Sequence, residues 1–491
     1  MKSKNEIKFY ALILIIVCLS GLRFTNLQAD FPSGLTGSTA LYTDEGLWAR
    51  NAVAALRSGA WYVQDGYNPI LSVPVIPLLQ MFLFRLFGVS LVAARSLVAA
   101  SSIILLGLVY ALLRRFLQRE LAIWGPLIIA GSYSFFAYSR IALLEIPMLC
   151  FAVLSLLIAL RTEASYVSVV ASAVALYLGI LTKTTALFVL PVIYLAVLMQ
   201  RGSRTKKLFK MLALTLTLLI LFATYYALVV QPFTSDYQTF SDTNISSQVA
   251  TSSWRFITEL KAIARVSLKL YPLLLPSYLG AAFLLLCLRS YRLNPLFLAA
   301  SLWAASAFLA LFSTHYHPSR YFVILIVPMA LTIPLAMEAA IDPRRIRQIK
   351  RGALTFAVII MLTANLARIT LHMAQPQFTF VRMAESVGVY MRRYGDQNSA
   401  SLIGEFADTI SLVSELDPVD IKRGSLALEA RIKQFNPQLF VSLGEMGDQE
   451  FEALSDDYRI EKIQTYNVFN NYAQGRPVFL YRLEKRQNPA A

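Results

Sequence analysis

Long apolar runs recur along the first three quarters of the chain, and they limit it to one class of fold. An α-helix needs about 20 apolar residues to cross the ~30 Å hydrocarbon core of a bilayer. Inside that core the backbone must satisfy its own hydrogen bonds, so such runs fold as helices. Hydrophobic residues make up 57% of the 491 and charged residues 15%, which is far from the composition of a soluble domain. The sequence therefore predicts a polytopic α-helical membrane protein.

The apolar runs predict about 11 transmembrane helices, with 13 as the upper bound. The first run follows Lys2, Lys4 and Lys8 as a signal peptide would, but the many later runs favour an uncleaved first helix. The predicted spans lie at about 9–27, 92–113, 121–138, 143–160, 166–182, 184–200, 211–230, 270–288, 296–313, 320–341 and 352–373.

The net charge of +16 could indicate nucleic-acid binding, so the location of the basic residues matters. If the N-terminus faces the cytoplasm, alternate connections do so too, and these six segments hold 19 Lys and Arg residues against four acids. Their net charge of +15 means that the positive-inside rule explains nearly all the basicity. Nucleic acid is thereby excluded as a partner. The same alternation places the loop after the first span, and everything after the eleventh, on the outer face.

The first outer loop, residues 28–91, contains two candidate helices. The segment TDEGLWARNAVAAL has the pattern of a helix lying in the membrane interface, with Thr43 as N-cap and acids in the first turn. The segment ILSVPVIPLLQMFLFRLFG, with two prolines near its start, predicts a second interfacial or re-entrant helix. Another outer loop, 231–268, ends in an amphipathic helix that carries Arg265, and its Asn244 fits a glycosylation acceptor pattern.

After Gln375 the composition changes to that of a soluble domain. FTFVRMAESVGVYMRRYG has helical spacing, SASLIG and PQLFVSL have the pattern of short buried strands, and DYRIEKIQTYNVF with RPVFLYRLE suggests a closing strand pair. We therefore predict two domains, a transmembrane domain over 1–374 and a small extracytoplasmic α/β domain over 375–491.

Four groups of ionisable residues lie at the predicted outer ends of spans, and each is a candidate site because charge near the hydrocarbon core is costly. Taken singly, each has an ordinary structural explanation: helix-start charges, a local ion pair, a snorkelling lysine and an interfacial polar belt. The groups are Asp44 with Glu45, Arg140 with Glu145, Lys183 alone, and His315 and His317 with Arg320.

The four groups are predicted to lie on the same side of the membrane, which favours a single shared site. Cytoplasmic charges are explained by the positive-inside rule, whereas these four groups come from four separate loops and gather at the outer edge. Carboxylates can take a proton from a hydroxyl, and cations can hold a phosphate. The pattern predicts a catalytic site on the outer face.

The ordered set of motifs resembles the membrane glycosyltransferase superfamily with the GT-C fold, specifically the relatives of protein O-mannosyltransferases and of the lipid A aminoarabinose transferase. The resemblance covers roughly residues 8–340. It is carried by YTDEGLWARNAVAAL, LFGVSLVAARSLVA, SRIALLEIPM, GILTKTTALFVLP and SRYFVILIVPMAL.

The resemblance implies a glycosyltransferase that moves a hexose or pentose from a polyprenyl-phosphate donor to an acceptor hydroxyl at the extracytoplasmic face, with inversion of the anomeric centre. In this scheme Asp44 is the general base, and Glu45 orients a substrate or helps to bind a metal. Arg140 and Glu145 shape the second side of the pocket.

The remaining candidates are assigned to substrate binding. Many relatives carry a Lys or His immediately before the proline that opens the second outer-loop helix, but this chain has Asn68. The phosphate contact is therefore expected from another cation. The resemblance leaves a metal open, because some members of the superfamily use a divalent cation and others need none; Asp44 and Glu145 could hold Mg²⁺ or Mn²⁺ through oxygen ligands. The substrate-binding candidates are Arg140, Lys183, Arg265, His317, Arg320 and Tyr321.

Two other functions fit a polytopic membrane protein. A secondary transporter or lipid flippase would place its binding groups near the midplane in repeated halves, and a scaffold would leave the outer charges without a shared purpose. The enzyme is favoured over both. We expect a bacterial plasma membrane location with a cytoplasmic N-terminus and a periplasmic or extracellular C-terminal domain. The expected partners are the lipid-linked donor, membrane lipid, and a lipid, glycan or protein acceptor.

Overall fold

The computed structural model describes most of the chain. The described residues are 4–36, 40–63, 68–161, 163–238, 256–314, 316–340, 349–394, 401–419, 421, 426–469 and 477–486. Asn244 and His315 lie outside them.

Helices occupy every predicted span. They are α1 (Lys4–Leu22), α4 (Leu91–Leu113), α5 (Arg119–Ala122), α6 (Trp124–Ala130), α7 (Tyr133–Tyr138), α8 (Glu145–Ala159), α9 (Tyr166–Thr182), α10 (Leu190–Leu198), α11 (Arg204–Tyr225), α14 (Leu274–Cys287), α15 (Pro295–Phe312), α16 (Ile326–Ala339) and α17 (Ile349–Ala374). The amphipathic helix predicted at the end of the loop 231–268 is α13 (Phe256–Leu270). The predicted helical membrane class is confirmed. Within the described residues, five helices are long and apolar enough to cross a membrane, or six if α13 and α14, bent by 106°, count as one span. The number 11 thus stays a prediction.

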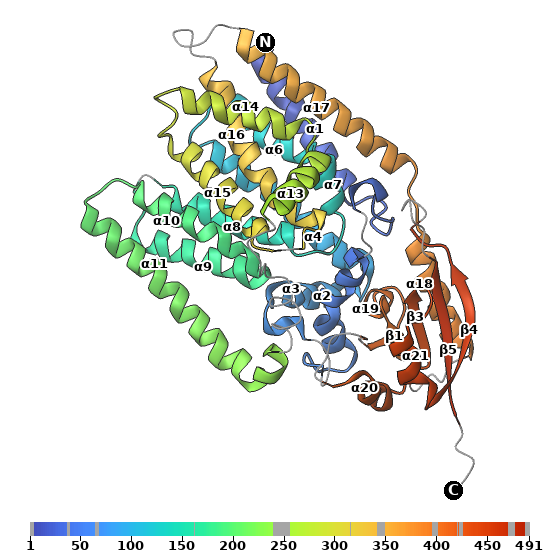
Figure 1. Ribbon diagram of the computed structural model, residues 1–491. Helices are drawn as coiled ribbons and strands as arrows, with labels where there is room; N and C mark the ends of the chain where they lie inside the picture. The colour runs from blue at the N-terminus through green and yellow to red at the C-terminus, as the bar shows by residue number, and fades with distance from the viewer. Residues whose placement is uncertain are drawn as a thin grey trace.

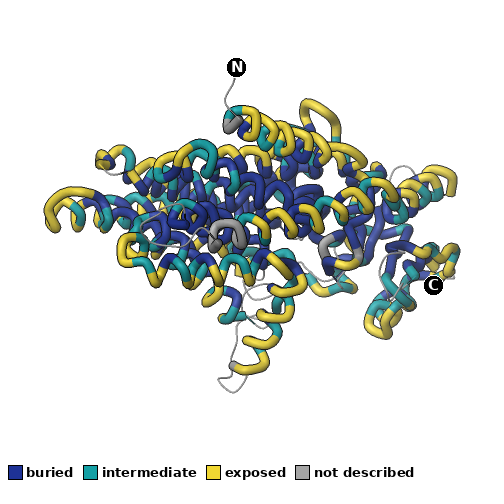
Figure 2. Tube along the Cα trace, turned by 90° about the horizontal axis from the view of Figure 1, so that it is seen from above, coloured by how far each residue is buried: buried dark blue, intermediate teal, exposed yellow. Residues whose placement is uncertain are grey.

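The helices differ in how far they are buried, and this separates a central element from peripheral ones. The window Ser319–Ala339 is 94% buried, whereas the windows in Arg204–Gln238 and Thr355–Tyr394 are 17% buried. Figure 2 shows buried residues filling the middle of the molecule and exposed residues along its outer turns. The apolar side chains exposed on the peripheral helices are those expected to face lipid.

The loop 28–91, predicted to lie on the outer face, forms α2 (Ala40–Arg57), a short 3₁₀ helix η2 (Pro69–Leu71) and α3 (Val75–Phe87). Both predicted loop helices are therefore present. The prediction that Thr43 caps the first one is wrong, because α2 begins at Ala40 and holds no acid in its first turn. Asp44 and Glu45 lie inside the helix, so their position is not explained by the helix N-terminus.

The C-terminal region forms a mixed five-stranded sheet with helices on both faces. The order is β2-β1-β3-β5-β4, with β1 parallel to β2 and β3, and β5 antiparallel to β3 and β4. The predicted helix, the two buried strands and the closing pair are all present. The elements are α18 (Thr379–Tyr394), β1 (Ser401–Gly404), α19 (Ala407–Ile410), β2 (Asp417–Val419), α20 (Leu428–Phe435), β3 (Leu439–Leu443), α21 (Asp448–Ser455), β4 (Tyr458–Tyr466) and β5 (Val478–Lys485).

Alternation along the strands divides the sheet into two packed faces. Ile403 and Phe440 pack with Ile432 and Leu454 of α20 and α21 in a separate small core. The neighbouring Leu402, Leu439 and Val441 belong instead to the core that includes α18 and continues into the membrane helices. The C-terminal domain is thus joined to the rest of the protein through apolar packing. Figure 1 shows the sheet and α19 beside α2.

Candidate active site

Asp44 of α2 lies in an ion-pair cluster built from four separate segments. Its Oδ2 is 2.7 Å from Nη2 of Arg320, and Nε of the same arginine is 3.6 Å from Oε1 of Glu145. The Glu145 oxygen also accepts a hydrogen bond of 2.5 Å from Nζ of Lys183. The Lys183 Nζ lies 4.2 Å from the centroid of the Tyr321 ring, which the Arg320 guanidinium also approaches at 5.5 Å. We call Asp44, Glu145, Lys183, Arg320 and Tyr321 the outer cluster.

Local sequence explains why Lys183 reaches this cluster. Three threonines surround it in ILTKTT, and β-branched residues weaken a helix. Helix α9 accordingly ends at Thr182, and Lys183 has an extended backbone before the 3₁₀ helix η3 (Thr184–Val189) begins. The lysine therefore leaves the helix axis instead of continuing along an apolar face.

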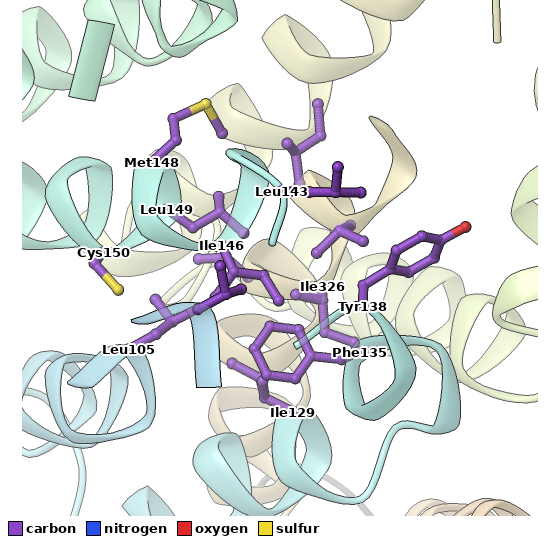
Figure 3. Packing of buried hydrophobic residues seen from close by; sticks show 14 of the residues in the cluster. Leu105, Ile129, Phe135, Tyr138, Leu143, Ile146, Met148, Leu149, Cys150 and Ile326 are labelled. Atoms are coloured by element: carbon purple, nitrogen blue, oxygen red, sulfur yellow. The ribbon is translucent and has the colours of Figure 1, made fainter. Parts of the chain in front are cut away.

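Glu145 and Arg320 also occupy starts of helical segments. Glu145 is the first residue of α8, where the partial positive charge of the helix end favours a carboxylate. Arg320 lies in the first turn of the 3₁₀ helix η8 (Ser319–Leu325), after the extended Pro318. Apolar side chains of α7, α8 and α16, including Phe135, Ile146 and Ile326, pack against one another and fix these backbones (Figure 3).

The outer cluster balances its own charge and is largely shielded from water. It contains two carboxylates and two cations, and its acidic and basic side chains are between 5% and 14% exposed. Removing one partner of a buried charge pair strongly destabilises the folded protein, because the other charge is left buried and unpaired. Any anion that enters must therefore compete with Asp44 and Glu145 for the two cations.

Glu45 follows Asp44 in α2 but enters a different network. Its Oε1 and Oε2 accept hydrogen bonds of 2.7 and 2.6 Å from Nε and Nη2 of Arg95, and Oε1 also accepts one of 2.7 Å from the Ala142 N–H. The remaining Arg95 Nη1 donates to the carbonyls of Leu27 and Ala29. Glu45 is 0% exposed and Arg95 1%. This network joins α2 to α4 and to two neighbouring connections.

Arg140 and Arg265 are not in the outer cluster. The Arg140 guanidinium donates hydrogen bonds of 2.9 Å to the carbonyls of Leu22 and Asn26, at the end of α1. The sequence pairs Arg140 with Glu145, but the structure aims the two side chains at different partners. Arg265 is exposed on α13 and forms no ion pair with another described residue.

His317 lies beside the cluster, three residues before Arg320. Its Nε2 is 2.5 Å from Oε2 of Glu259 on α13, and within the described part of the chain its buried Nδ1 has no hydrogen-bond partner. The neighbouring Tyr316 packs edge-on against Tyr321, with ring centroids 6.0 Å apart. Burial raises the pKa of the Tyr316 hydroxyl, so it stays protonated and can donate.

Asn68 occupies the position where many relatives of the resembled family carry a cation, and here it braces the loop. Its Oδ1 accepts hydrogen bonds of 2.8 Å from Asn51 Nδ2 and from the Val63 N–H. Its Nδ2 donates to the Val63 carbonyl at 2.9 Å. The asparagine thus ties α2 to the start of α3 and brings no positive charge.

Sequence reasoning missed two charged residues that the structure places at this end of the molecule. Arg95 could have been found from the sequence, because it lies inside a predicted span and a charge there is a candidate site in its own right. Glu259 could not have been found in this way, because an acid on an amphipathic helix usually faces water.

An apolar groove is lined by residues of the helix that carries Glu259 and of a neighbouring helix. It has a volume of about 510 Å³ and is formed between α13 and α15. Leu260 at its edge follows Glu259, the partner of His317. Its other lining residues are Ala304, Ala305, Phe308, Leu309 and Phe312.

The oxygen ligands suit a divalent cation poorly in this arrangement. Mg²⁺ and Mn²⁺ favour several unpaired oxygens around one position. Asp44 and Glu145 instead share the Arg320 guanidinium, and Lys183 holds the second carboxylate. Among the described residues, no group of three His, Cys, Asp or Glu side chains converges on one point.

Comparisons with known proteins identify the fold. Residues 69–227 match the family described as dolichyl-phosphate-mannose-protein mannosyltransferase. No curated protein sequence matches the chain.

Solved structures match nearly the whole chain. ArnT from Cupriavidus metallidurans in the apo state has a TM-score of 0.62 and 14% identity over 96% of this chain and 98% of its own. The same protein bound to undecaprenyl phosphate has a TM-score of 0.59 and 15% identity, over 96% of this chain and 97% of its own. The apo oligosaccharyltransferase of Archaeoglobus fulgidus has a TM-score of 0.54 and 12% identity, over 98% of this chain and 75% of its own. The chain therefore has the GT-C fold.

Proposed function

We propose that this GT-C protein is a glycosyltransferase that moves a sugar from a polyprenyl-phosphate carrier to an acceptor hydroxyl at the outer face of the membrane. The observation that carries the proposal is the outer cluster, in which carboxylates and cations from four distant segments meet at distances of 2.5–3.6 Å between their charged atoms. The fold shared with a protein solved with undecaprenyl phosphate supports the class of donor.

Arg320 and Lys183 would hold the donor phosphate. Guanidinium and ammonium groups form strong charge-assisted hydrogen bonds with phosphate oxygens. Both cations are paired with carboxylates in the absence of a ligand, so phosphate binding exchanges these partners instead of creating an unpaired charge. The exchange would also release Asp44 from Arg320 as the donor arrives.

Asp44 would then act as general base. The acceptor oxygen attacks the anomeric carbon and forms the new glycosidic bond while its proton passes to an Asp44 oxygen. The bond between that carbon and the phosphate oxygen breaks, and its electron pair leaves with the polyprenyl phosphate. Attack opposite to the leaving phosphate inverts the anomeric centre. Arg320 and Lys183 stabilise the charge that develops on the phosphate.

Glu45 is less suited to this role, because its two oxygens already accept three hydrogen bonds. We assign it to the positioning of α2. The proposed mechanism assigns the stabilisation of charge on the phosphate to Arg320 and Lys183, and it routes no step through a divalent metal.

The apolar groove between α13 and α15 would take the first isoprene units of the carrier. Leu260 at the groove edge is next in sequence to Glu259, whose partner His317 is three residues from Arg320. A lipid tail in the groove would thus emerge close to the cations that hold its phosphate. His317 and Tyr321 would contact the phosphate or the sugar from the same side.

Donor binding tests the cationic part of the proposal. We expect Lys183→Gln to weaken binding of undecaprenyl phosphate by about 10- to 100-fold, because a hydrogen bond to a charged group contributes roughly 1.5–3 kcal/mol. Titration of the purified protein in detergent gives Kd. Lys269→Gln is the matched control, since Lys269 is an exposed lysine of α13. An unchanged Kd in Lys183→Gln would remove this lysine from the phosphate site.

Turnover tests the reaction itself. The wild-type protein is incubated with undecaprenyl-phosphate-linked hexoses and pentoses and with a cell-envelope extract as acceptor. Mass spectrometry should detect free undecaprenyl phosphate together with a glycosylated product. Movement of the intact lipid-linked sugar across a liposome bilayer, without cleavage, would contradict the proposal and support a flippase.

A further inference from the structure

The C-terminal domain covers the outward side of α2 at very close range. A Cβ atom added to Gly46 would overlap the carbonyl of Asp408 and the amide nitrogen of Thr409. Arg50 Nη1 lies 3.7 Å from Asp408 Oδ1. Further along the helix, Arg57 donates to the carbonyls of Leu416, Ser411 and Ser414. The helix that bears the acidic pair is therefore enclosed between two domains.

The Thr409 hydroxyl enters the hydrogen-bond ladder of α2. It accepts a hydrogen bond of 2.9 Å from the Gly46 N–H and donates one to the Tyr42 carbonyl. In a regular α-helix the N–H of residue i bonds to the carbonyl of residue i−4, and Tyr42 and Gly46 have this spacing. The residues enclosed by this pair are Thr43, Asp44 and Glu45.

Insertion of a side chain into the ladder is a known cause of local helix bending. Here it acts on the turn from which Asp44 reaches Arg320 and Glu45 reaches Arg95. Consecutive helical residues point about 100° apart, so a small change in this turn moves both carboxylates relative to their partners. Glu45 is fixed by three hydrogen bonds. A change in the turn would therefore displace mainly Asp44.

From this geometry we infer that Thr409 is a positioning residue for sugar transfer: the C-terminal domain supplies a hydroxyl that sets the placement of Asp44. The inference rests on the proposed function, and it makes this domain part of the catalytic unit instead of an appended acceptor module.

Two further contacts hold the domain in place against α2. Asp30, after the first span, accepts hydrogen bonds from the N–H groups of Thr379 and Phe380 and so caps α18 from another part of the chain. The Tyr42 ring packs against Phe380 and Phe469, with centroids 5.3 and 4.2 Å apart. The Thr409 turn is thus held beside the acidic pair even without its hydroxyl.

The test compares Thr409→Val, which keeps the side-chain shape without the hydroxyl, with Thr409→Ser, which keeps the hydroxyl. Ser411→Ala is the matched control, because its hydroxyl belongs to the same turn but bonds to Asp408 within the C-terminal domain. We expect Thr409→Val to lower kcat at least 10-fold, since small misplacements of a reacting group have large effects on rate. The Kd for undecaprenyl phosphate and the unfolding temperature should stay close to those of Ser411→Ala, and Thr409→Ser should recover most of kcat.

The outcomes separate this inference from the proposed function. Full kcat in Thr409→Val would overturn the positioning role. So would parallel losses of kcat, donor binding and unfolding temperature that Thr409→Ser does not restore, since these indicate a structural contact only. Absence of transfer by the wild-type protein, with donor binding intact, would instead contradict the proposed function.

Discussion

Replacing Asp44 with asparagine is expected to lower kcat for sugar transfer by roughly 10²- to 10⁴-fold, the usual contribution of a positioned general base. Asparagine has nearly the same shape as aspartate but cannot accept the acceptor proton at neutral pH. Single-turnover measurements with a lipid-linked sugar would separate this chemical step from donor binding and product release.

Donor binding provides the internal control for Asp44→Asn. Arg320 would lose one of its two carboxylate partners and keep Glu145. The affinity for undecaprenyl phosphate should therefore persist or increase while transfer is lost. Glu452→Gln, which removes an exposed carboxylate of α21, should leave both quantities unchanged. Full turnover by Asp44→Asn would exclude Asp44 as the base, and a weakened affinity would show that Asp44 helps to bind the donor.

Disrupting the Glu45–Arg95 pair should have the largest effect on stability. Both side chains are buried, and removal of one partner from a buried ion pair typically destabilises a protein by about 3–5 kcal/mol. Arg95→Met leaves the Glu45 carboxylate without its bidentate partner, and it also frees the carbonyls of Leu27 and Ala29. We expect a markedly lower unfolding temperature for the purified protein in detergent.

A double-mutant cycle shows whether the pair itself is responsible. Glu45→Leu combined with Arg95→Met removes both charges, so it should be less destabilising than the sum of the single changes. Arg119→Met is the matched control, because Arg119 forms an exposed pair with Glu120, and it should leave the unfolding temperature almost unchanged. Strict additivity of the Glu45 and Arg95 changes would contradict the proposed coupling.

Much of the architecture could be predicted because it depends on local sequence. Apolar runs gave the positions of the helices, since bilayer thickness and backbone hydrogen bonding constrain every span in the same way. Short apolar segments predicted β1 and β3 as buried strands in the C-terminal domain, and two longer segments predicted the β4–β5 pair. Boundaries were less reliable: α2 begins at Ala40, so Thr43 does not cap it.

For the candidate residues, local sequence predicted which side chains matter but not which partners they contact. Charges at span ends pointed to Asp44, Glu145, Lys183 and Arg320, which the structure brings together. The partner of each could not be predicted, because a side chain's partner depends on how distant segments pack. Arg140 was paired with Glu145 from their proximity in sequence, yet it bonds to carbonyls at the end of α1.

Hydropathy and charge are properties of short segments, so they were sufficient to predict the membrane class, the places of the helices and the residue types available for chemistry. The tertiary structure alone decided that Asp44 and Glu45 enter different networks, and that both sides of α2 are covered. Its amphipathic pattern predicts a helix with one face in water, but the C-terminal domain buries that face and places Thr409 against Gly46. No local preference encodes such contacts, because they join distant parts of the chain; Gly46 and Thr409, for example, are 363 positions apart.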